Sequence, residues 1–286
     1  MKQAEIKRGS QKAGKIFDGI WSNALALILA LIWLVPVIWV VLSAFSTQKT
    51  YNTGTFFPTS YTLNNFADLW NNTKFKNWLL NTFILAVCNM VLTTFVTVMT
   101  AFCLSRFRFK GRKALMNISL ILGMFPGFMA MVAVYLILNL LGLVGSIWAL
   151  LLYYVCGAGM GFFVTKGYFD TIPGDIDEAA KLDGANQFRI FFQIYLPLAK
   201  PIIIYTALMA FMGPWADYIL AGLVLTKDAD MTVAVGLYNW MTASKINTYF
   251  TKFCAGSVIV AIPIVGLYLS LQRFFVEGIS AGAVKG

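Results

Sequence analysis

The chain alternates between long apolar runs and short polar segments. Six runs are long enough to cross a bilayer, which takes roughly 20 residues at about 1.5 Å of rise per residue. The runs lie near residues 22–45, 78–104, 114–141, 143–165, 201–225 and 253–275. Almost no polar sequence separates the third run from the fourth. The pattern therefore predicts an all-α polytopic membrane protein with six transmembrane helices.

The composition agrees with this fold class. Of the 286 residues, 59% are hydrophobic and 12% are charged, and the mean hydropathy is +0.74. Soluble globular domains carry about twice that share of charge. The first run follows a basic tail, as in a signal peptide, but it exceeds the apolar core of about 7–15 residues found there. We expect an uncleaved first span.

The distribution of positive charge predicts the orientation in the membrane. The side that holds loops 46–77 and 226–252 has only six of the 22 Lys and Arg residues, namely Lys49, Lys74, Lys76, Lys227, Lys245 and Lys252. Since Lys and Arg concentrate on the cytoplasmic side, these two loops are predicted to face outward. The tail 1–21, the loop 170–200 and the tail 277–286 are then cytoplasmic, and residues 22–276 form one transmembrane domain.

Several kinds of chemistry are excluded by residue type. The chain has no His, which removes imidazole metal sites and His acid–base catalysis. Its four Cys residues stand in or beside apolar runs without the spacing of metal ligands, so buried thiols are expected. A phosphate loop GxxxxGK[ST] is absent from the sequence. No basic run lies on a soluble module, which leaves nucleic-acid binding unsupported. We predict no catalytic residue and no metal site.

The polar loop 170–200 is predicted to form two short helices. Asp175 and Glu178 have the spacing of a capping box for the first helix. Gly184 suits the left-handed position that ends it, and Asn186 is placed to cap the second helix.

The second helix of this loop carries large apolar side chains. Phe188, Phe191, Phe192 and Tyr195 have the i, i+3, i+4 and i+7 spacing of a single helical face. Pro197 is predicted to end the helix before the next span. The loop therefore presents one aromatic stripe.

The joint spacing in this loop resembles a known motif. Glu178-Ala179-Ala180, then Gly184, then Ile194 and Leu196-Pro197 resemble the EAA loop of ABC-importer permeases, which docks on a cytoplasmic ATPase. The segments 231–236 and 275–286 are similar to those of the maltose-type (MalG-like) carbohydrate permease subunits. The resemblance covers most of the chain and implies the type I ABC importer (MetI-like) permease fold.

The resemblance also implies roles for particular residues. The set that would couple to the ATPase is Glu178, Ala179, Ala180, Asp183, Gly184, Phe188, Phe191, Phe192, Ile194, Leu196 and Pro197. The set that would contact a binding protein is Val235, Gly236, Tyr238, Asn239 and Trp240. Gly282 and Lys285, in the C-terminal tail, would reach toward the ATPase.

Trp215, Asp217 and Tyr218 are candidates for the pathway or the subunit interface. The family often has Trp-Asn-acid-aromatic here, whereas this chain has Ala216 in the second position. Asp217 is the only acid inside a predicted span, and a charge at mid-membrane costs about 2.5–3.5 kcal/mol on insertion scales. It therefore faces protein or water, or lies at the membrane surface.

The function implied is that of a permease subunit of an ATP-driven sugar or oligosaccharide (maltose/maltodextrin-like) importer. The implied partners are a homologous MalF-like permease subunit, a dimer of MalK-like ATPase subunits, an extracellular or periplasmic sugar-binding protein and membrane lipid. ATP and Mg would be bound by the ATPase, and this chain would hold no cofactor. A multi-pass protein of the bacterial plasma membrane follows, with both termini cytoplasmic.

Three alternatives remain at this point. The chain could carry another solute within the same class. It could instead be an ion-coupled secondary transporter, which would need ionisable relay groups inside the spans, where Asp217 is the sole acid. A membrane enzyme is the weakest alternative, because the sequence offers no catalytic constellation.

Overall fold

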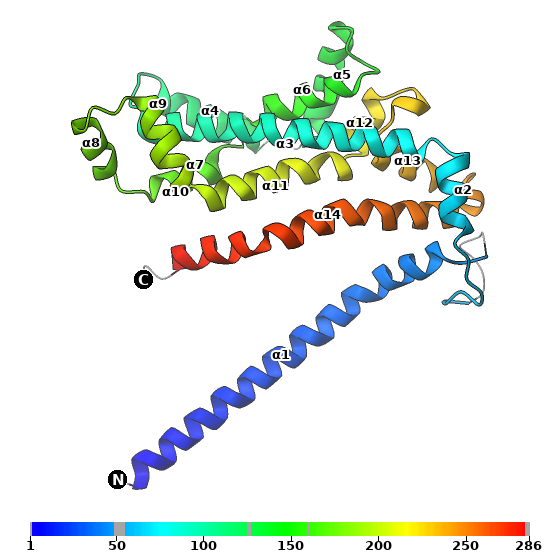
Figure 1. Ribbon diagram of the computed structural model, residues 1–286, viewed down its shortest axis with the longest axis horizontal. Coiled ribbons are helices and arrows are strands. Elements are labelled where there is room, and N and C mark those ends of the chain that lie inside the picture. The colour runs from blue at the N-terminus through cyan, green and yellow to red at the C-terminus, as the bar shows by residue number, and fades with distance from the viewer. Residues whose placement is uncertain (1, 49–54, 125–126, 159–160, 284–286) are drawn as a thin grey trace.

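The computed structural model describes residues 2–48, 55–124, 127–158 and 161–283, with residues 2–20, 128 and 273–283 described by backbone alone. These residues form a bundle of helices (Figure 1), and Ser46 and Tyr61 pair in one isolated antiparallel bridge. The α-helices are α1 (Lys2–Ala44), α2 (Asn64–Asn72), α3 (Phe75–Arg106), α4 (Arg112–Gly123), α5 (Gly127–Leu140), α6 (Ile147–Ala158), α7 (Phe163–Asp170), α8 (Asp175–Leu182), α9 (Gln187–Ile190), α10 (Leu196–Leu198), α11 (Lys200–Ala216), α12 (Ile219–Val224), α13 (Val233–Trp240) and α14 (Ile246–Ala283). A π-helical turn η1 (Phe191–Tyr195) and a 3₁₀ turn η2 (Asp228–Asp230) complete the set.

Four helical stretches are long and apolar enough to cross a membrane. They are Trp21–Ala44, Phe75–Arg106, Ile147–Asp170 and Ile246–Gln272. A fifth crossing results if Gln187–Leu198 and Lys200–Ala216, which meet at 82°, are counted as one broken span.

The predicted third span differs from the structure. Residues 114–141 are divided between α4 and α5, and each of these helices is shorter than a bilayer crossing. Six crossings would require α4 and α5 to cross together.

Helix α3 is the centre of the bundle. It packs along α11, α6, α7 and α13, and Figure 1 shows α11 running beside it, with α14 on the far side of α11. Large buried side chains cluster around both of its ends: Phe75 and Trp78 at its start, and Phe102 and Leu104 near its finish.

Helix α1 stands apart from the other helices. Figure 1 shows it meeting α14 near one end and then diverging from the bundle. No part of its most apolar stretch is buried inside the chain. Where the two helices meet, the Trp39 ring lies 5.5 Å from that of Phe250, and Trp39 Nε1 donates to the Phe56 carbonyl at 2.8 Å.

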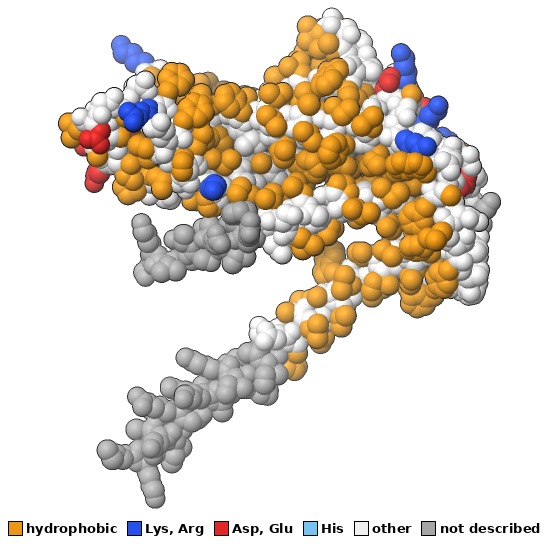
Figure 2. Space-filling model, in the orientation of Figure 1, with side chains coloured by type: hydrophobic (Ala, Val, Ile, Leu, Met, Phe, Trp, Pro, Cys, Tyr) orange, Lys and Arg blue, Asp and Glu red, His pale blue; other side chains and the backbone are white. Residues whose placement is uncertain are grey.

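The molecule has two polar ends. The α8 end consists of residues 104–113 and 166–200, and the α13 end consists of residues 55–80 and 226–252. Figure 2 shows charged side chains gathered at these ends, with a broad hydrophobic surface between them. This distribution matches a bilayer-spanning body with an aqueous face at each end.

Candidate functional site

Gly184 ends α8, the first short helix of the α8 end, as the sequence predicted. Gly184 has φ +79°, in the left-handed region that favours glycine. Its N–H donates to the Lys181 carbonyl at 3.0 Å, and the N–H of Ala185 donates to the Ala180 carbonyl at 2.9 Å. These two bonds form a Schellman motif. The predicted bend at Gly184 is confirmed.

The predicted capping box at the start of α8 is wrong. The residue that precedes the helix is Gly174, and Asp175 is already its first helical residue. The Asp175 side chain is therefore not in the position of a cap. Asp175, Asp177 and Glu178 instead lie in the first turn, where carboxylates are stabilised by the helix dipole.

The second short helix begins as predicted. Asn186 Oδ1 accepts a hydrogen bond from the Arg189 N–H at 2.9 Å and so caps α9.

This helix continues through a π-helical turn, η1, and ends next to Pro197 before the following span, as predicted. The Leu196 N–H donates to the Phe191 carbonyl. Pro197 lacks an N–H and its ring crowds the preceding turn, which favours such a widening. The helix runs on to Leu198, where the chain bends into α11.

The aromatic stripe predicted for this helix is divided between two faces. Phe191 and Tyr195 are only 4% and 0% exposed and pack against Phe102 of α3, with ring centroids 4.8 and 5.1 Å apart. Phe188 and Phe192 are 70% and 51% exposed. The prediction of one common face is therefore wrong, because the helix lies directly on α3 and covers half of its own aromatic side chains.

The other predicted coupling residues fall into two groups. Ala180 is buried, while Ile194 and Leu196 are partly buried. The exposed residues include Ala179, Asp183 and Pro197. We use the name docking face for five exposed side chains of this loop, namely Glu178, Ala179, Leu182, Asp183 and Phe188. The spacing of Glu178 and Leu182, and of Ala179 and Asp183, places them on one side of α8.

Arg106, the last residue of α3, joins the α8 end to the bundle. Its Nη2 donates to the Phe169 carbonyl at 2.7 Å and to the Ile172 carbonyl at 2.6 Å. Its guanidinium lies 4.8 Å from the centre of the Tyr195 ring, and its Nε lies 3.9 Å from Asp177 Oδ2. One side chain thus holds the end of α7, the start of α8 and η1. In the sequence this arginine contributed only to the charge count.

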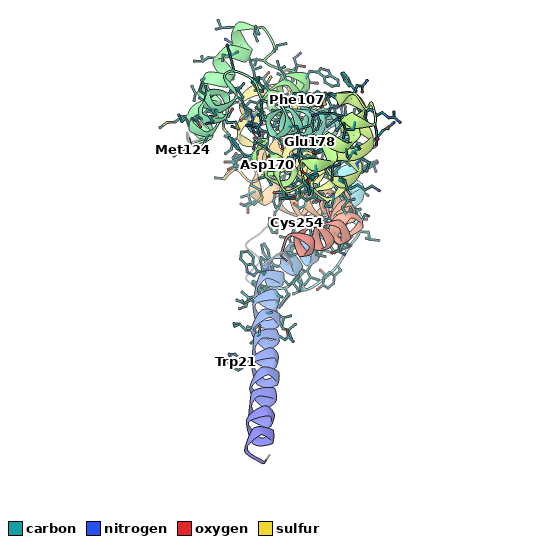
Figure 3. The ribbon with its side chains drawn as sticks, turned by 90° about the vertical axis from the view of Figure 1, so that its left-hand side faces the viewer. Trp21, Phe107, Met124, Asp170, Glu178 and Cys254 are labelled. Atoms are coloured by element: carbon teal, nitrogen blue, oxygen red, sulfur yellow. The ribbon has the colours of Figure 1, made fainter. Side chains whose placement is uncertain are left out.

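Tyr195 and Asp170 complete the surroundings of Arg106. Burial raises the pKa of the Tyr195 phenol, so Arg106 faces a neutral ring. The Asp170 carboxylate accepts from Ser105 Oγ at 2.6 Å and pairs with Lys166 Nζ at 2.5 Å. Figure 3 looks onto this end of the molecule and shows Phe107, Asp170 and Glu178.

At the opposite end, α3 holds the loop 226–252 through its first turns. Trp78 Nε1 donates to the Asp228 carbonyl at 2.5 Å, and Asn81 Nδ2 donates to the carbonyls of Ala229 and Met231. The buried Thr82 Oγ1 accepts from the Val233 N–H at 2.8 Å.

Most of the residues predicted to contact a binding protein are buried at this end. Val235, Gly236 and Trp240 lie inside the protein, and a Cβ added at Gly236 would overlap the Trp78 indole. They are therefore not available as contacts in this structure. Tyr238 is exposed and Asn239 is partly exposed.

Asp217 lies at the break between α11 and α12. Its Oδ2 accepts from the Tyr154 hydroxyl at 2.6 Å, and its Oδ1 accepts from the Leu220 N–H at 3.1 Å. The side chain is half-buried, and these two donors stabilise the carboxylate. Trp215 is buried, whereas Tyr218 is exposed and stacks on Tyr238 with ring centroids 4.4 Å apart.

The last two predicted site residues are those of the C-terminal tail. Gly282 lies in the last turn of α14, and Lys285 lies outside the described residues. Within the part of the chain that the structure describes, no group of three or more Cys, Asp or Glu side chains could hold a metal ion.

These observations define a class of protein. The bundle is an all-helical, multi-pass membrane protein, with one projecting loop of two short helices and one loop closed onto the central helix. The model of the family "Binding-protein-dependent transport system inner membrane component" matches residues 94–276. The chain belongs to this family of ABC transporter permeases, which are multi-pass proteins of the inner or plasma membrane.

Individual relatives support the assignment over nearly the whole chain. The maltodextrin transport system permease protein MdxG of Bacillus subtilis (strain 168) is 38% identical, covering 91% of this chain and 95% of that protein. The galactooligosaccharides transport system permease protein GanQ of the same organism is 34% identical, covering 93% of this chain and 95% of that protein.

A solved structure supports the fold. A crystal structure of a bacterial ABC transporter involved in the import of the acidic polysaccharide alginate contains a chain that is 25% identical, with a TM-score of 0.78, covering 91% of this chain and 97% of that one. The chain therefore has the type I ABC importer permease fold. It is a non-catalytic component of a binding-protein-dependent transporter, in which a partner ATPase uses the ATP. The ion-coupled transporter and the membrane enzyme are thereby set aside.

Proposed function

We propose that this chain forms half of the translocation pathway of an importer for oligosaccharides of the maltodextrin or galactooligosaccharide type. Two relatives named for such sugars, each more than 30% identical over more than 90% of both chains, support this substrate class. Permeation of another solute of the same class is the alternative. The other half of the pathway would be a homologous MalF-like subunit.

The single observation that carries the mechanism is that both polar loops are attached to α3. Arg106 holds the α8 end, and Trp78, Asn81 and Thr82 hold the loop of the α13 end. Between them runs one uninterrupted helix of 32 residues, about 48 Å long. A displacement of the α8 end would therefore be carried along α3 to the opposite face.

The docking face would bind a cytoplasmic MalK-like ATPase. Glu178 and Asp183 would pair with basic groups of the ATPase, and Leu182 and Phe188 would fill an apolar cleft in it. Phe191, with the partly buried Ile194 and Leu196 near it, would hold the second helix on the bundle. Phe192 and Pro197 are exposed and would be available to the ATPase. The tail 277–286, with Gly282 and Lys285, would reach the same ATPase.

The α13 end would face a sugar-binding protein on the outer side. Tyr238 and Asn239 are the members of the predicted contact set that reach the surface. Tyr218 lies against Tyr238, next to Asp217, so these side chains are the candidates for contact with a passing sugar. Tyrosine rings can stack on sugar rings, and a carboxylate can accept hydrogen bonds from sugar hydroxyls.

Gly184→Asp tests the docking assignment. Gly184 has open space around its Cβ position, so the change adds a charge beside the docking face without a steric clash. Any side chain also strains the left-handed backbone at φ +79°. Gly142→Asp is the matched control, because Gly142 also has a positive φ (+69°) and open space, but lies in the turn between α5 and α6.

Both variants would be purified with the second permease subunit and the ATPase. We expect Gly184→Asp to reach the membrane normally, while ATPase recovery and the ATP hydrolysis stimulated by the loaded binding protein fall by about tenfold or more, which corresponds to about 1.4 kcal/mol of lost docking energy. Gly142→Asp imposes the same kind of backbone strain, at φ +69°, but should keep full ATPase recovery and hydrolysis because it lies in the turn between α5 and α6. Full coupling in Gly184→Asp would refute the docking role.

A further inference from the structure

The turn between α3 and α4 carries a dense positive charge that the transport mechanism does not use. Five of eight consecutive residues are basic, namely Arg106, Arg108, Lys110, Arg112 and Lys113. The same eight residues contain no Asp or Glu. Because the turn directly follows the span Phe75–Arg106, it lies where a bilayer has its headgroups.

These five side chains have different surroundings. Arg106 is committed to α7, α8 and η1, as described above, and Arg112 Nε donates to the Leu104 carbonyl at 2.7 Å. Arg108, Lys110 and Lys113 are exposed. In the described ranges none of these three forms an ion pair. Three positive charges are therefore available to a ligand.

The three cations line one hollow. Residues 108–114 line a shallow surface hollow of about 780 Å³ that is largely open to solvent. Gly111, at φ +90°, turns the chain so that residues before and after it face the same space. The hollow is open on the side where an anionic headgroup could approach all three cations.

Two aromatic side chains flank this hollow in different ways. Phe107 is turned inward against Phe102, with ring centroids 5.6 Å apart. Phe109 stands between Arg108 and Lys110 and is 46% exposed. An exposed aromatic ring at the end of a span is typical of the membrane–water interface.

The geometry points to a binding site for the phosphate headgroup of an anionic phospholipid, such as phosphatidylglycerol, formed by Arg108, Lys110 and Lys113. Basic side chains beside a membrane attract anionic lipid by roughly fivefold each. The neighbouring Phe109 would anchor the turn among the acyl chains. This site goes beyond the proposed function, because it depends on neither the cargo nor the ATPase docking face.

The test uses the whole transporter complex in nanodiscs of phosphatidylcholine with a minor fraction of phosphatidylglycerol. The variant is R108Q/K110Q/K113Q. The matched control is K74Q/K227Q/K245Q, which removes the same charge from three exposed lysines at the α13 end. After extraction in mild detergent, native mass spectrometry counts the phosphatidylglycerol molecules that remain bound.

We expect the triple variant to bind phosphatidylglycerol roughly 100-fold more weakly, since three cations are lost, while the control retains it. Inorganic phosphate at millimolar concentration should not displace the lipid from the unaltered complex. The site is overturned if the variant retains as much lipid as the control, or if inorganic phosphate competes fully. It is also overturned if lipid retention is unchanged and ATPase recovery falls instead, because the cations would then contact an acidic protein surface.

Discussion

At the α13 end, the loop 226–252 folds back onto the bundle, whereas at the α8 end the loop 170–200 projects from it. The first loop places Val233, Leu237 and Trp240 inside the protein. The second leaves Leu182 and Phe188 exposed, at 89% and 70%. Large apolar side chains in an exposed loop favour contact with another protein. The loop 226–252 is therefore closed onto this chain, whereas the loop 170–200 leaves apolar side chains available for the proposed contact with the ATPase.

The two ends also keep their shape by different means. At the α8 end, the bend between α8 and α9 depends on bonds within a few residues, formed by Gly184 and Asn186. At the α13 end, Trp78 and Thr82 bond to residues about 150 positions later in the chain. Hydrogen bonds between residues close in sequence keep the shape of a projecting loop that packs on no other helix. Hydrogen bonds between residues far apart in sequence form only once the bundle has folded.

The largest expected effect separates the two faces of the projecting helix. Phe191→Ala should lower the free energy of unfolding by about 3–5 kcal/mol, because it empties a buried site beside Phe102. Phe188→Ala should change it by less than about 0.5 kcal/mol and should weaken ATPase association instead. Thermal unfolding of the purified subunit and ATPase recovery measure the two outcomes. Equal destabilisation by both variants would contradict the division of the aromatic stripe.

A smaller effect is expected from overpacking the closed end. Gly236→Ala would press a methyl group into the Trp78 indole, which should lower the free energy of unfolding by about 1–3 kcal/mol. Gly222→Ala, in the neighbouring helix α12, is the control, because its Cβ would lie at an ordinary contact distance of 4.0 Å from Val235. The unfolding midpoint of each variant tests this. No shift for Gly236→Ala would show that α13 packs less tightly on α3.

The smallest effect concerns a single cap. Asn186→Ala should destabilise the start of α9 by about 0.5–2 kcal/mol, because the Arg189 N–H loses its acceptor. Hydrogen exchange in the peptide that contains Arg189 should accelerate, with little change at the α13 end. Asn64→Ala is the control, since the helix α2 has no side-chain cap bond at its start. Unchanged exchange for Asn186→Ala would mean that packing, not the cap, orders this helix.

The sequence predicted the parts of the α8 end that depend on neighbours in the chain. Gly184 and Asn186 were identified because a left-handed glycine and an asparagine cap act within five residues. The π-helical turn and the burial of Phe191 and Tyr195 were missed, because they depend on where α3 lies. A helical spacing of aromatics does not say which side will meet another helix.

The α13 end was less predictable for the same reason. Gly236 was assigned to a partner, yet its lack of a side chain is required by Trp78, which is distant in sequence. The apolar runs predicted most spans correctly, because span length is a property of each run alone. Two runs were exceptions, since 114–141 is divided between α4 and α5 and 201–225 is broken between α11 and α12.

The isolation of α1 has a consequence for the order of assembly. Its backbone groups are bonded within the helix and its apolar side chains need no protein neighbour, so it is stable in lipid by itself. The contact of Trp39 with Phe250 requires α14, which follows every other helix in the chain. The end of α1 is already held by α2, since the Ala44 carbonyl accepts from Asn65 Nδ2. The subunit can therefore insert α1 first and complete its packing on the bundle when the last span has been made.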